Sequence, residues 1–598
     1  MGKAGAIAYV ETQFQLDLLN HYDPKQQIPA VVCTPALEYA LLNTQRRSLR
    51  PNAVFSDSDA YEASRQTYAL TRSLCEEIDR TTCEVFGYTG PVERISTISL
   101  FYYMKMFVDH MKVRSSQILS LLEQGGYDTL MVLPSEEVKP EFSIHPYKRG
   151  TTSAIAPIMA RRLGMEIVQV APALPAPEYP PQKIIARPEA APKAVSPCLL
   201  IDEKSYESGP VPERWKQETG GDVVNIAEVM KLAAPTAAHF EKGRQLLEAL
   251  RRNPAVQALC TWQGGSLMEV ADPLLACLAL SYIPRQVALS ETTKAFSAFA
   301  PCAMLVSSMG VCVHENARAA GMKSFVYQHG GCAVRENPLL DYVWRFDADY
   351  LLSYGPGTSS YFKSWDHGNN IVCGDTVAMP HSVGAQQLRE LERKKLSGRE
   401  QYGLMFISTM QAGDMIFYSH HFSDFWYWDF KRKLVSVLSE KECECAVKVH
   451  PHESADAPLK PFMEEQSIDN CEIVAAPLVD CLDKAEAFAV DSFSTCILQL
   501  CLTTKPILAL AMEEFFRFNP EALELLERRV ELCRSEEEFL NRLKSFPEEE
   551  TFNPDRLHNR EFLEAYGLGE DDPTEAAIRF IQKTLSDVGR KPVEQGRI

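Results

Sequence analysis

Short runs of apolar and β-branched residues alternate with amphipathic stretches along the first 170 residues. Apolar residues at helical spacing follow the apolar run 6–10. A later stretch with helical spacing, 152–163, is followed directly by Gly164. A glycine after a helix is a common C-cap, and strand–helix–strand alternation is typical of a parallel sheet with crossover helices. We therefore predict strands at 6–10, 30–33, 129–133 and 166–170 and helices at 13–19 and 152–163.

A segment rich in proline and alanine, 171–197, interrupts this alternation. Such a composition favours extended polyproline conformations and cannot build a core, so we predict a linker or a long surface excursion. The alternation then resumes with strands at 303–307, 324–327, 350–353 and 371–375 and a helix at 312–320, which Gly321 ends.

A charged helical stretch, 386–395, connects two blocks of this alternation, and the second block contains predicted strands at 403–408, 444–449, 487–490 and 506–510. The pattern favours an α/β chain with two Rossmann-like domains that face a cleft and an extended N-terminal region. We divide the chain into an N-terminal α/β region (1–170), the linker (171–197), the remainder of the first Rossmann-like domain (198–395) and the second Rossmann-like domain (396–598).

Charge and cysteine content narrow the class of protein. The 598 residues carry a formal net charge of -19, and such a surface repels nucleic acid and anionic lipid. The 17 cysteines include no CxxC pair and are dispersed through apolar segments. This usage indicates reduced core residues of a cytoplasmic protein and disfavours a zinc site.

The apolar runs are too short or too interrupted for a membrane span. The longest uncharged run, 295–313, contains Pro301 and Gly310, whereas a membrane helix needs ~20 strongly apolar residues. The N-terminus lacks the apolar core and the cleavage site of a signal peptide. We expect a soluble protein without a transmembrane segment, associated with membranes at most peripherally.

Two basic residues stand at the end of a predicted strand in Lys448-Val449-His450-Pro451. Strand alternation places Lys448 and His450 on one side, at the carboxyl edge where ligands bind in open α/β sheets. Lysine supplies a point charge for phosphate, and histidine supplies a donor whose charge changes near neutral pH. The alternative is a histidine bonded to a turn carbonyl.

Hydroxyl groups gather where the next predicted strand meets a helix, in the stretch that contains Asp491, Ser492, Ser494 and Thr495. Free backbone N–H groups and the helix dipole favour an anion at such a point, so this turn suits the phosphate of a nucleotide. A simple helix N-cap is the alternative interpretation.

The segment Gln328-His329-Gly330-Gly331 follows a strand of the first Rossmann-like domain. Glycines permit the close approach of a ligand to the backbone, and by the same edge rule Gln328 and Gly330 are candidate substrate-binding residues. His329 is a candidate general base for an acceptor hydroxyl or a donor to the leaving phosphate. A loop histidine beside a flexible turn is the alternative.

Three carboxylates are further candidates for the base. Glu315 begins the helix before His329, where it could equally complement the helix dipole. Glu136 and Glu137 follow the strand 129–133, and paired acids in a cleft can have raised pKa values. Solvated loop residues are the alternative for both places.

An aromatic stretch, 417–430, follows the first strand of the second Rossmann-like domain. Phe422, Trp426 and Phe430 recur at helical spacing and predict a core-facing stripe. Trp428 is left for a cleft or the surface, where an aromatic face could stack on a sugar.

The motifs VYQHGG, KVHP and VDSFST...KPIL together resemble those of bacterial inverting GT-B glycosyltransferases of surface-polysaccharide type, over roughly residues 305–510. That group includes polysialyltransferases, Kdo transferases and CDP-glycerol glycerophosphotransferases. The resemblance implies that His450, Ser492, Ser494 and Thr495 bind the donor phosphate and that His329 acts as base. It also implies that 198–395 is the acceptor side and 396–598 the donor side.

The leading hypothesis is therefore a metal-independent, inverting glycosyltransferase without a cofactor. Its donor would be a CMP-activated sugar of the nonulosonic acid or Kdo kind, and its acceptor a glycan or protein hydroxyl. The alternatives are a CDP-glycerol-type glycerophosphotransferase, a nucleotide-sugar epimerase or hydrolase of the same fold, and a non-catalytic scaffold in polysaccharide assembly.

Overall fold

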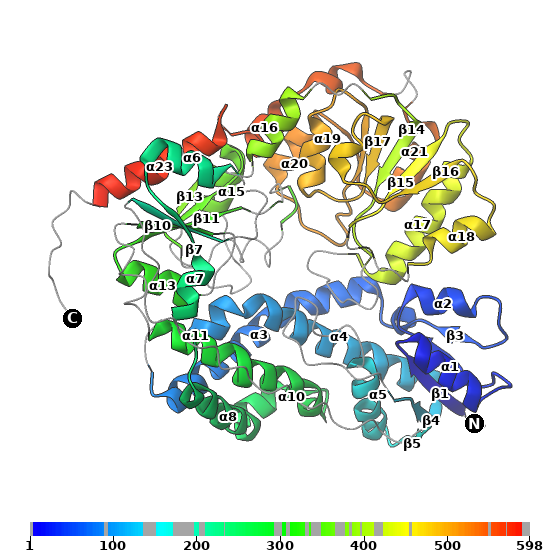
Figure 1. The fold of residues 1–598 in the computed structure, drawn as a ribbon. Coiled ribbons are helices and arrows are strands. Elements are labelled where there is room, and N and C mark those ends of the chain that lie inside the picture. Colours follow the sequence, from blue (N-terminus) through cyan, green and yellow to red (C-terminus); the bar gives the residue numbers. More distant parts are fainter. Residues whose placement is uncertain are drawn as a thin grey trace.

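The computed structural model describes residues 4–88, 94–134, 151–170, 197–202, 210–232, 234–291, 302–306, 311–328, 330, 334–336, 348–364, 377–381, 385–394, 398–411, 422–451, 453, 457–547, 552–569 and 571–588. Within them the chain forms three parallel sheets with helices between consecutive strands. Figure 1 shows the second and third sheets beside each other, and the first sheet close to the N-terminus. The predicted linker 171–197, apart from its last residue, and the predicted strand 371–375 lie outside the described residues.

The first sheet belongs to the N-terminal region and has the strand order β3-β2-β1-β4-β5. Its strands are β1 (Ala4–Val10), β2 (Ala30–Val32), β3 (Ser48–Leu49), β4 (Tyr127–Val132) and β5 (Glu166–Gln169), all paired in parallel. Helices α1 (Gln13–Tyr22), α2 (Pro35–Leu41) and α5 (Thr151–Arg162) connect or follow them.

The carboxylate of Glu11 lies at the carboxyl edge of this first sheet. This is the point where the strand order reverses, between β1 and β4. Glu11 follows β1, and its carboxylate accepts hydrogen bonds from the backbone N–H groups of Thr152 and Ser153, both at 2.8 Å. These groups start α5, whose unpaired N–H groups favour a negative charge. Glu11 therefore serves as an internal anion for that helix.

The second sheet has the order β13-β12-β11-β10-β6-β7. Its strands are β6 (Cys198–Ile201), β7 (Val223–Asn225), β10 (Cys302–Val306), β11 (Lys323–Tyr327), β12 (Tyr350–Leu352) and β13 (Val377–Met379). The helices of this sheet include α6 (Val211–Thr219), α13 (Val311–Ala319) and α15 (Pro356–Ser364).

The third sheet has the order β16-β15-β14-β17-β18-β19, which is the Rossmann order 3-2-1-4-5-6. Its strands are β14 (Tyr402–Ile407), β15 (Cys445–Lys448), β16 (Cys471–Val474), β17 (Ala485–Val490), β18 (Ile507–Leu510) and β19 (Glu531–Cys533). Its helices include α17 (Asp424–Ser439), α18 (Leu459–Glu465), α19 (Thr495–Cys501), α20 (Pro520–Glu527) and α21 (Glu536–Ser545). The predicted α/β class with two Rossmann-like sheets is confirmed.

The last helix of the chain returns to the second sheet. Helix α16 (Ala385–Arg393) connects the second and third sheets, whereas α23 (Pro573–Val588) packs Ile578 and Ile581 against Leu199 and Leu305 of the second sheet. The C-terminal end of segment 396–598 thus completes the core of the preceding segment.

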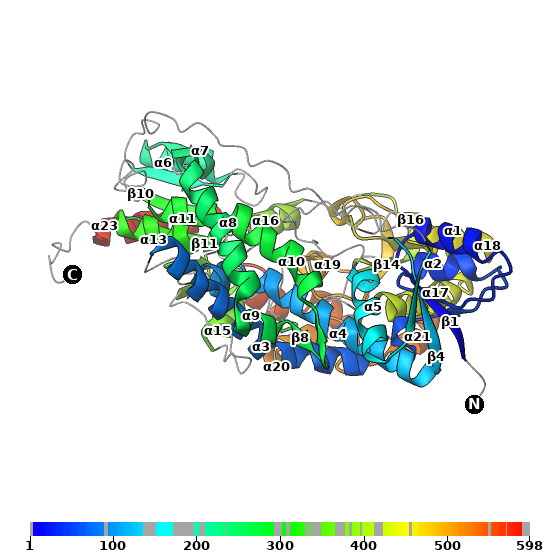
Figure 2. The same ribbon diagram turned by 90° about the horizontal axis from the view of Figure 1, so that it is seen from below.

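Two long helices, which the sequence pattern did not predict, lie below the second and third sheets in the view of Figure 1. They are α3 (Asp57–Phe86) and α4 (Phe101–Gly125), and Figures 1 and 2 show them crossing the molecule. The 30 residues of α3 span about 45 Å at the rise of an α-helix. Near its start Tyr61 joins the core of the third-sheet domain, and farther along Leu74 and Ile78 join the largest core, to which helix α8 (Ala237–Arg252) belongs.

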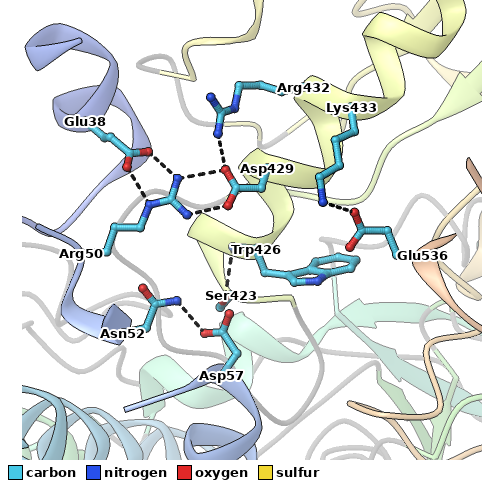
Figure 3. Close-up of polar contacts among 10 residues, drawn as sticks. All are labelled: Glu38, Arg50, Asn52, Asp57, Ser423, Trp426, Asp429, Arg432, Lys433 and Glu536. Atoms are coloured by element: carbon cyan, nitrogen blue, oxygen red, sulfur yellow. Dashed lines mark hydrogen bonds and ion pairs between the residues drawn. The ribbon is translucent and has the colours of Figure 1, made fainter. Parts of the chain in front are cut away.

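An arginine ties the N-terminal region to the third-sheet domain. Figure 3 shows Arg50 between Glu38, on α2, and Asp429, on α17. Arg50 Nε lies 2.6 Å from Glu38 Oε1, and Arg50 Nη2 lies 2.9 Å from Asp429 Oδ1. Its guanidinium carbon also lies 5.1 Å from the ring centroid of Phe425. Because the planar guanidinium pairs with both carboxylates bidentately, it sets the orientation as well as the distance of the two helices.

None of the helices in the described part of the chain is long and apolar enough to cross a membrane. No disulfide bond joins any two of the cysteines that the structure describes.

A buried ion pair within α4 joins this helix to α3 through hydrogen bonds. Lys105 Nζ contacts Asp109 Oδ2 and lies 2.9 Å from the backbone oxygen of Ser64. Asp109 also accepts hydrogen bonds from the hydroxyls of Ser64 and Thr67, and both charged side chains are fully buried. Burial lowers the pKa of Lys105, and Asp109 opposes that change. Because both groups lie away from water, loss of either partner would leave the other buried without a counter-charge.

We expect Asp109→Leu to lower the free energy of unfolding by about 3–5 kcal/mol, because it leaves the Lys105 ammonium buried without a counter-charge. The double variant Lys105→Met/Asp109→Leu should recover most of that loss. Urea denaturation measures both. Glu62→Gln, at an exposed ion pair on α3, is the control and should leave the midpoint almost unchanged. A double variant as unstable as the single one would contradict this account.

Candidate functional site

A buried aspartate stands at the reversal point of the third sheet, between β14 and β17. Asp491 follows β17 directly, and its carboxylate accepts hydrogen bonds from Thr409 N–H (3.0 Å) and from the Tyr427 hydroxyl. The Tyr427 hydroxyl also lies 2.8 Å from Ser408 Oγ. Burial raises the pKa of Asp491 to about 7, and the Tyr427 hydrogen bond opposes that rise. Both carboxylate oxygens are therefore engaged by the protein itself.

A charge pair between buried Lys431 and half-buried Glu453 connects the KVHP segment to the end of β14. Lys431, on α17, contacts Glu453 and lies 4.6 Å from the ring centroid of Tyr427. Glu453 accepts a hydrogen bond from Gln411 N–H at 3.0 Å, and its own N–H donates to the backbone oxygen of His450 at 2.9 Å. The His450 turn is thus held against the edge where a ligand of this fold class binds.

Lys448 is the last residue of β15 and is buried. Its Nζ lies 2.9 Å from the backbone oxygen of Val449, and burial lowers its pKa. His450 is half-buried and Pro451 is exposed. Because β15 ends at Lys448, the predicted strand alternation does not extend to His450, which lies in a turn instead.

The hydroxyl-rich turn follows β17 as predicted. Ser492 and Thr495 are half-buried, whereas Ser494 is exposed and stands at the N-cap position of α19. The Ser494 side chain makes no capping hydrogen bond; its Oγ lies 3.3 Å from the thiol of Cys496, which also lies 3.3 Å from the backbone oxygen of Ser492. Ser494 thus occupies the N-cap position, as the alternative interpretation expected, but its side chain makes no capping hydrogen bond.

Gln328 is fully buried and shapes the end of β11. Its amide nitrogen donates to the backbone oxygen of Gly330 (3.0 Å), and its amide oxygen accepts from Tyr354 N–H (3.1 Å). Gly330 has a φ of +68°, and a Cβ atom placed there would lie 2.8 Å from Thr495 Oγ1. The ends of strands from two sheets therefore meet at Gly330 and Thr495.

Main-chain hydrogen bonds strengthen this contact between the two domains. Arg335 forms an antiparallel bridge with Phe518, Asn519 N–H donates to the backbone oxygen of Val334 (2.8 Å), and Glu336 N–H donates to that of Arg517 (3.0 Å). We call residues 334–336 the crossing segment. It lies on the stretch that follows β18, in which Phe518 packs against Phe493 of the hydroxyl-rich turn at 5.7 Å between centroids.

Glu315 has other partners. Its carboxylate, on α13, pairs with Arg94 and lies 3.7 Å from Arg318 Nη1. Two guanidinium groups therefore surround this candidate base. The other three candidate bases, His329, Glu136 and Glu137, lie outside the described residues.

Three residues that support the site were not predicted from the sequence: Tyr427, Lys431 and Glu453. Tyr427 lies in the aromatic stretch, on the side of α17 that faces Asp491, and a tyrosine among buried aromatics was the available sign. Within that stretch Phe422 precedes α17, which begins at Asp424. The placement of Trp428 at a cleft or the surface was wrong, since its side chain is 1% exposed and packs against Phe462.

No cluster of three or more metal-binding side chains occurs among the residues that the structure places.

Comparison with known proteins finds no matching family model and no matching curated sequence. Among solved structures, the GtfA/B complex matches 51% of this chain and 61% of its own, at 11% identity and a TM-score of 0.32. HepE of Anabaena with UDP and glucose matches 65% and 99% at 10% identity (TM-score 0.33). Medicago truncatula UGT71G1 with UDP-glucose matches 65% and 98% at 10% identity (TM-score 0.35). All three scores lie below 0.5, so the fold description rests on the strand order and pairing.

We expect Gly330→Ala to destabilise the protein through two effects, the positive φ and the contact with Thr495 Oγ1. Thr495→Ala removes the second effect, so Gly330→Ala should cost less in that background. A double-mutant cycle of melting temperatures measures this coupling. Strictly additive changes would show that the two domains do not meet here.

We expect melting temperature to fall between pH 4 and pH 7 in part because of Asp491. Its pKa is raised to about 7 in the folded protein, so over this window the unfolded chain releases a proton that the folded chain keeps. Asp491→Asn should flatten this fall, measured by differential scanning fluorimetry across the range. Asp17→Asn, at an exposed site, is the control. An unchanged slope in Asp491→Asn would contradict the prediction.

Proposed function

We propose that this chain is a GT-B-type glycosyltransferase that moves a sugar from a nucleotide-activated donor to a hydroxyl of a glycan or protein. The observation that carries the proposal is the contact between Gly330 and Thr495. It joins the QHGG segment to the hydroxyl-rich turn at the reversal point of a Rossmann-ordered sheet, where ligands of such sheets bind.

The donor phosphate would lie against the hydroxyl-rich turn. The exposed Ser494 hydroxyl is not used as a helix cap, and Ser492 and Thr495 are partly accessible. Lys448 is the last residue of β15, and His450 follows it at the carboxyl edge of the same sheet. Both would supply positive charge. Asp491 would act beneath them by holding Thr409 and Tyr427 in place.

The acceptor would be activated from the side of the second sheet. His329 stands between Gln328 and Gly330, and in this proposal it takes the proton of the acceptor hydroxyl. The acceptor oxygen then bonds to the anomeric carbon, with inversion, as the bond from that carbon to the phosphate oxygen breaks. The phosphate leaves with the electron pair, and Lys448 and the hydroxyls stabilise its charge.

The donor class that the motifs favour is a CMP-activated nonulosonic acid or Kdo, transferred without a metal ion. A thermal-shift screen of CMP, CDP, UDP and GDP tests this choice. A response to CMP alone supports it, a response to CDP favours glycerophosphate transfer, and no response favours a scaffold. Formation of product without an acceptor would favour an epimerase or hydrolase.

We expect substitutions on the donor side and on the acceptor side of the site to have different kinetic effects. Lys448→Ala and Ser494→Ala should weaken nucleotide binding about 10-fold or more, because each removes a partner of a charged phosphate. His329→Ala should leave nucleotide binding intact and lower turnover by about 10²–10⁴-fold. Isothermal titration with the nucleotide found in the screen, together with transfer assays, measures both.

The control for the lysine is Lys460→Ala, an exposed lysine on α18. Full activity of Lys448→Ala and His450→Ala would remove the phosphate assignment. Full activity of His329→Ala would move the base to another residue.

A further inference from the structure

Three distant parts of the chain converge on the aromatic pair Phe515 and Phe516, which follows β18. Tyr61, from α3, stacks on Phe515 at 4.7 Å between centroids and meets Phe516 edge-on at 5.9 Å. Phe422, which precedes α17, lies 5.1 Å from Phe516. The guanidinium of Arg335 lies 4.5 Å from the centroid of Phe516. Residues of the N-terminal region, of the third-sheet domain and of the crossing segment therefore all contact Phe516.

The main chain explains why Arg335 reaches this ring. Arg335 is the bridge partner of Phe518, and Phe516 lies two residues earlier on the same partner stretch. In an extended pair, residues two apart point to the same face. The hydrogen bonds on either side, at Val334 and Glu336, fix this register.

The crossing segment lies close in the chain to the QHGG segment, which supplies the proposed base. Gly330, which meets Thr495, precedes Arg335 by only five residues of chain, so the two contacts fasten neighbouring points of the second-sheet domain to the third-sheet domain. A cation held over the face of a buried aromatic ring is favourable because the charge is partly desolvated there. Phe516 is 6% exposed, which meets that condition.

We propose that Arg335 is a positioning residue: through Phe516 it holds the crossing segment on the third-sheet domain and so sets the distance between Gly330 and the hydroxyl-rich turn. This inference rests on the proposed function. Arg335 acts on turnover through geometry, because small displacements of reacting groups reduce rate far more than they reduce binding.

The test compares Arg335→Met, which keeps the apolar stem without the charge, with Arg335→Lys, which keeps the charge. Arg335→Met should lower the turnover number about tenfold and leave the Michaelis constant for the donor within about twofold. Arg335→Lys should recover most of the turnover. Arg528→Met, at an exposed ion pair of the third-sheet domain, is the control and should match the wild type.

Hydrogen exchange supplies a readout that does not depend on activity. The amides of Glu336 and Asn519 donate across the domain contact, so Arg335→Met should speed their exchange, whereas exchange in β14 and β17 should stay unchanged. Phe516→Leu, which removes the ring beneath the cation, should reproduce both effects if Arg335→Met fails to fold.

Faster exchange with unchanged turnover would overturn the positioning role, and so would unchanged exchange at both amides. If the wild-type protein transfers no sugar from any donor, the proposed function fails. The positioning role fails with it, while the exchange measurement still decides whether Arg335 joins the two domains.

Discussion

The direct main-chain contact between the second and third sheets is the constraint on which the candidate site depends. Parallel sheets collect their loops at the carboxyl edge, but two such edges form one site only if something fixes their separation. Here the bridge at Arg335 and Phe518 and the close approach of Gly330 to Thr495 provide that separation. Backbone hydrogen bonds tolerate little change in register, so this part of the contact is defined more sharply than side-chain packing alone would allow.

The N-terminal region limits the freedom of this contact further. Helix α3 touches the aromatic pair beside the site with Tyr61 and continues into the core that contains α8. Arg50, with Glu38 and Asp429, attaches the N-terminal region to α17 (Figure 3). Tyr427 and Lys431 of the same helix support the site. A rotation of the third-sheet domain would therefore have to break contacts at both α3 and α17.

The sequence predicted the strands near the site well and the long helices poorly, for one physical reason. The strands β14, β17 and β18 are buried on both faces, so each is a short apolar run between polar turns, which a sequence pattern reveals. Helices α3 and α4 bury polar residues against each other, including Thr67, Lys105 and Asp109. Their buried faces therefore do not show as apolar stripes. Side-chain partnerships such as Asp491 with Tyr427, 64 residues apart, leave no periodic trace at all.

The strand order reverses in the first sheet as it does in the third, but the two carboxyl edges differ in the groups that occupy them. In the third sheet the hydroxyl-rich turn leaves Ser494 exposed, whereas in the first sheet Glu11 already occupies the N–H groups that begin α5. Because Glu11 is part of the chain, its carboxylate is always present at the start of α5. A dissolved anion would have to displace it to bind there. The N-terminal region thus has the strand reversal of a Rossmann-like sheet, but its own carboxylate fills the anion position at the start of α5.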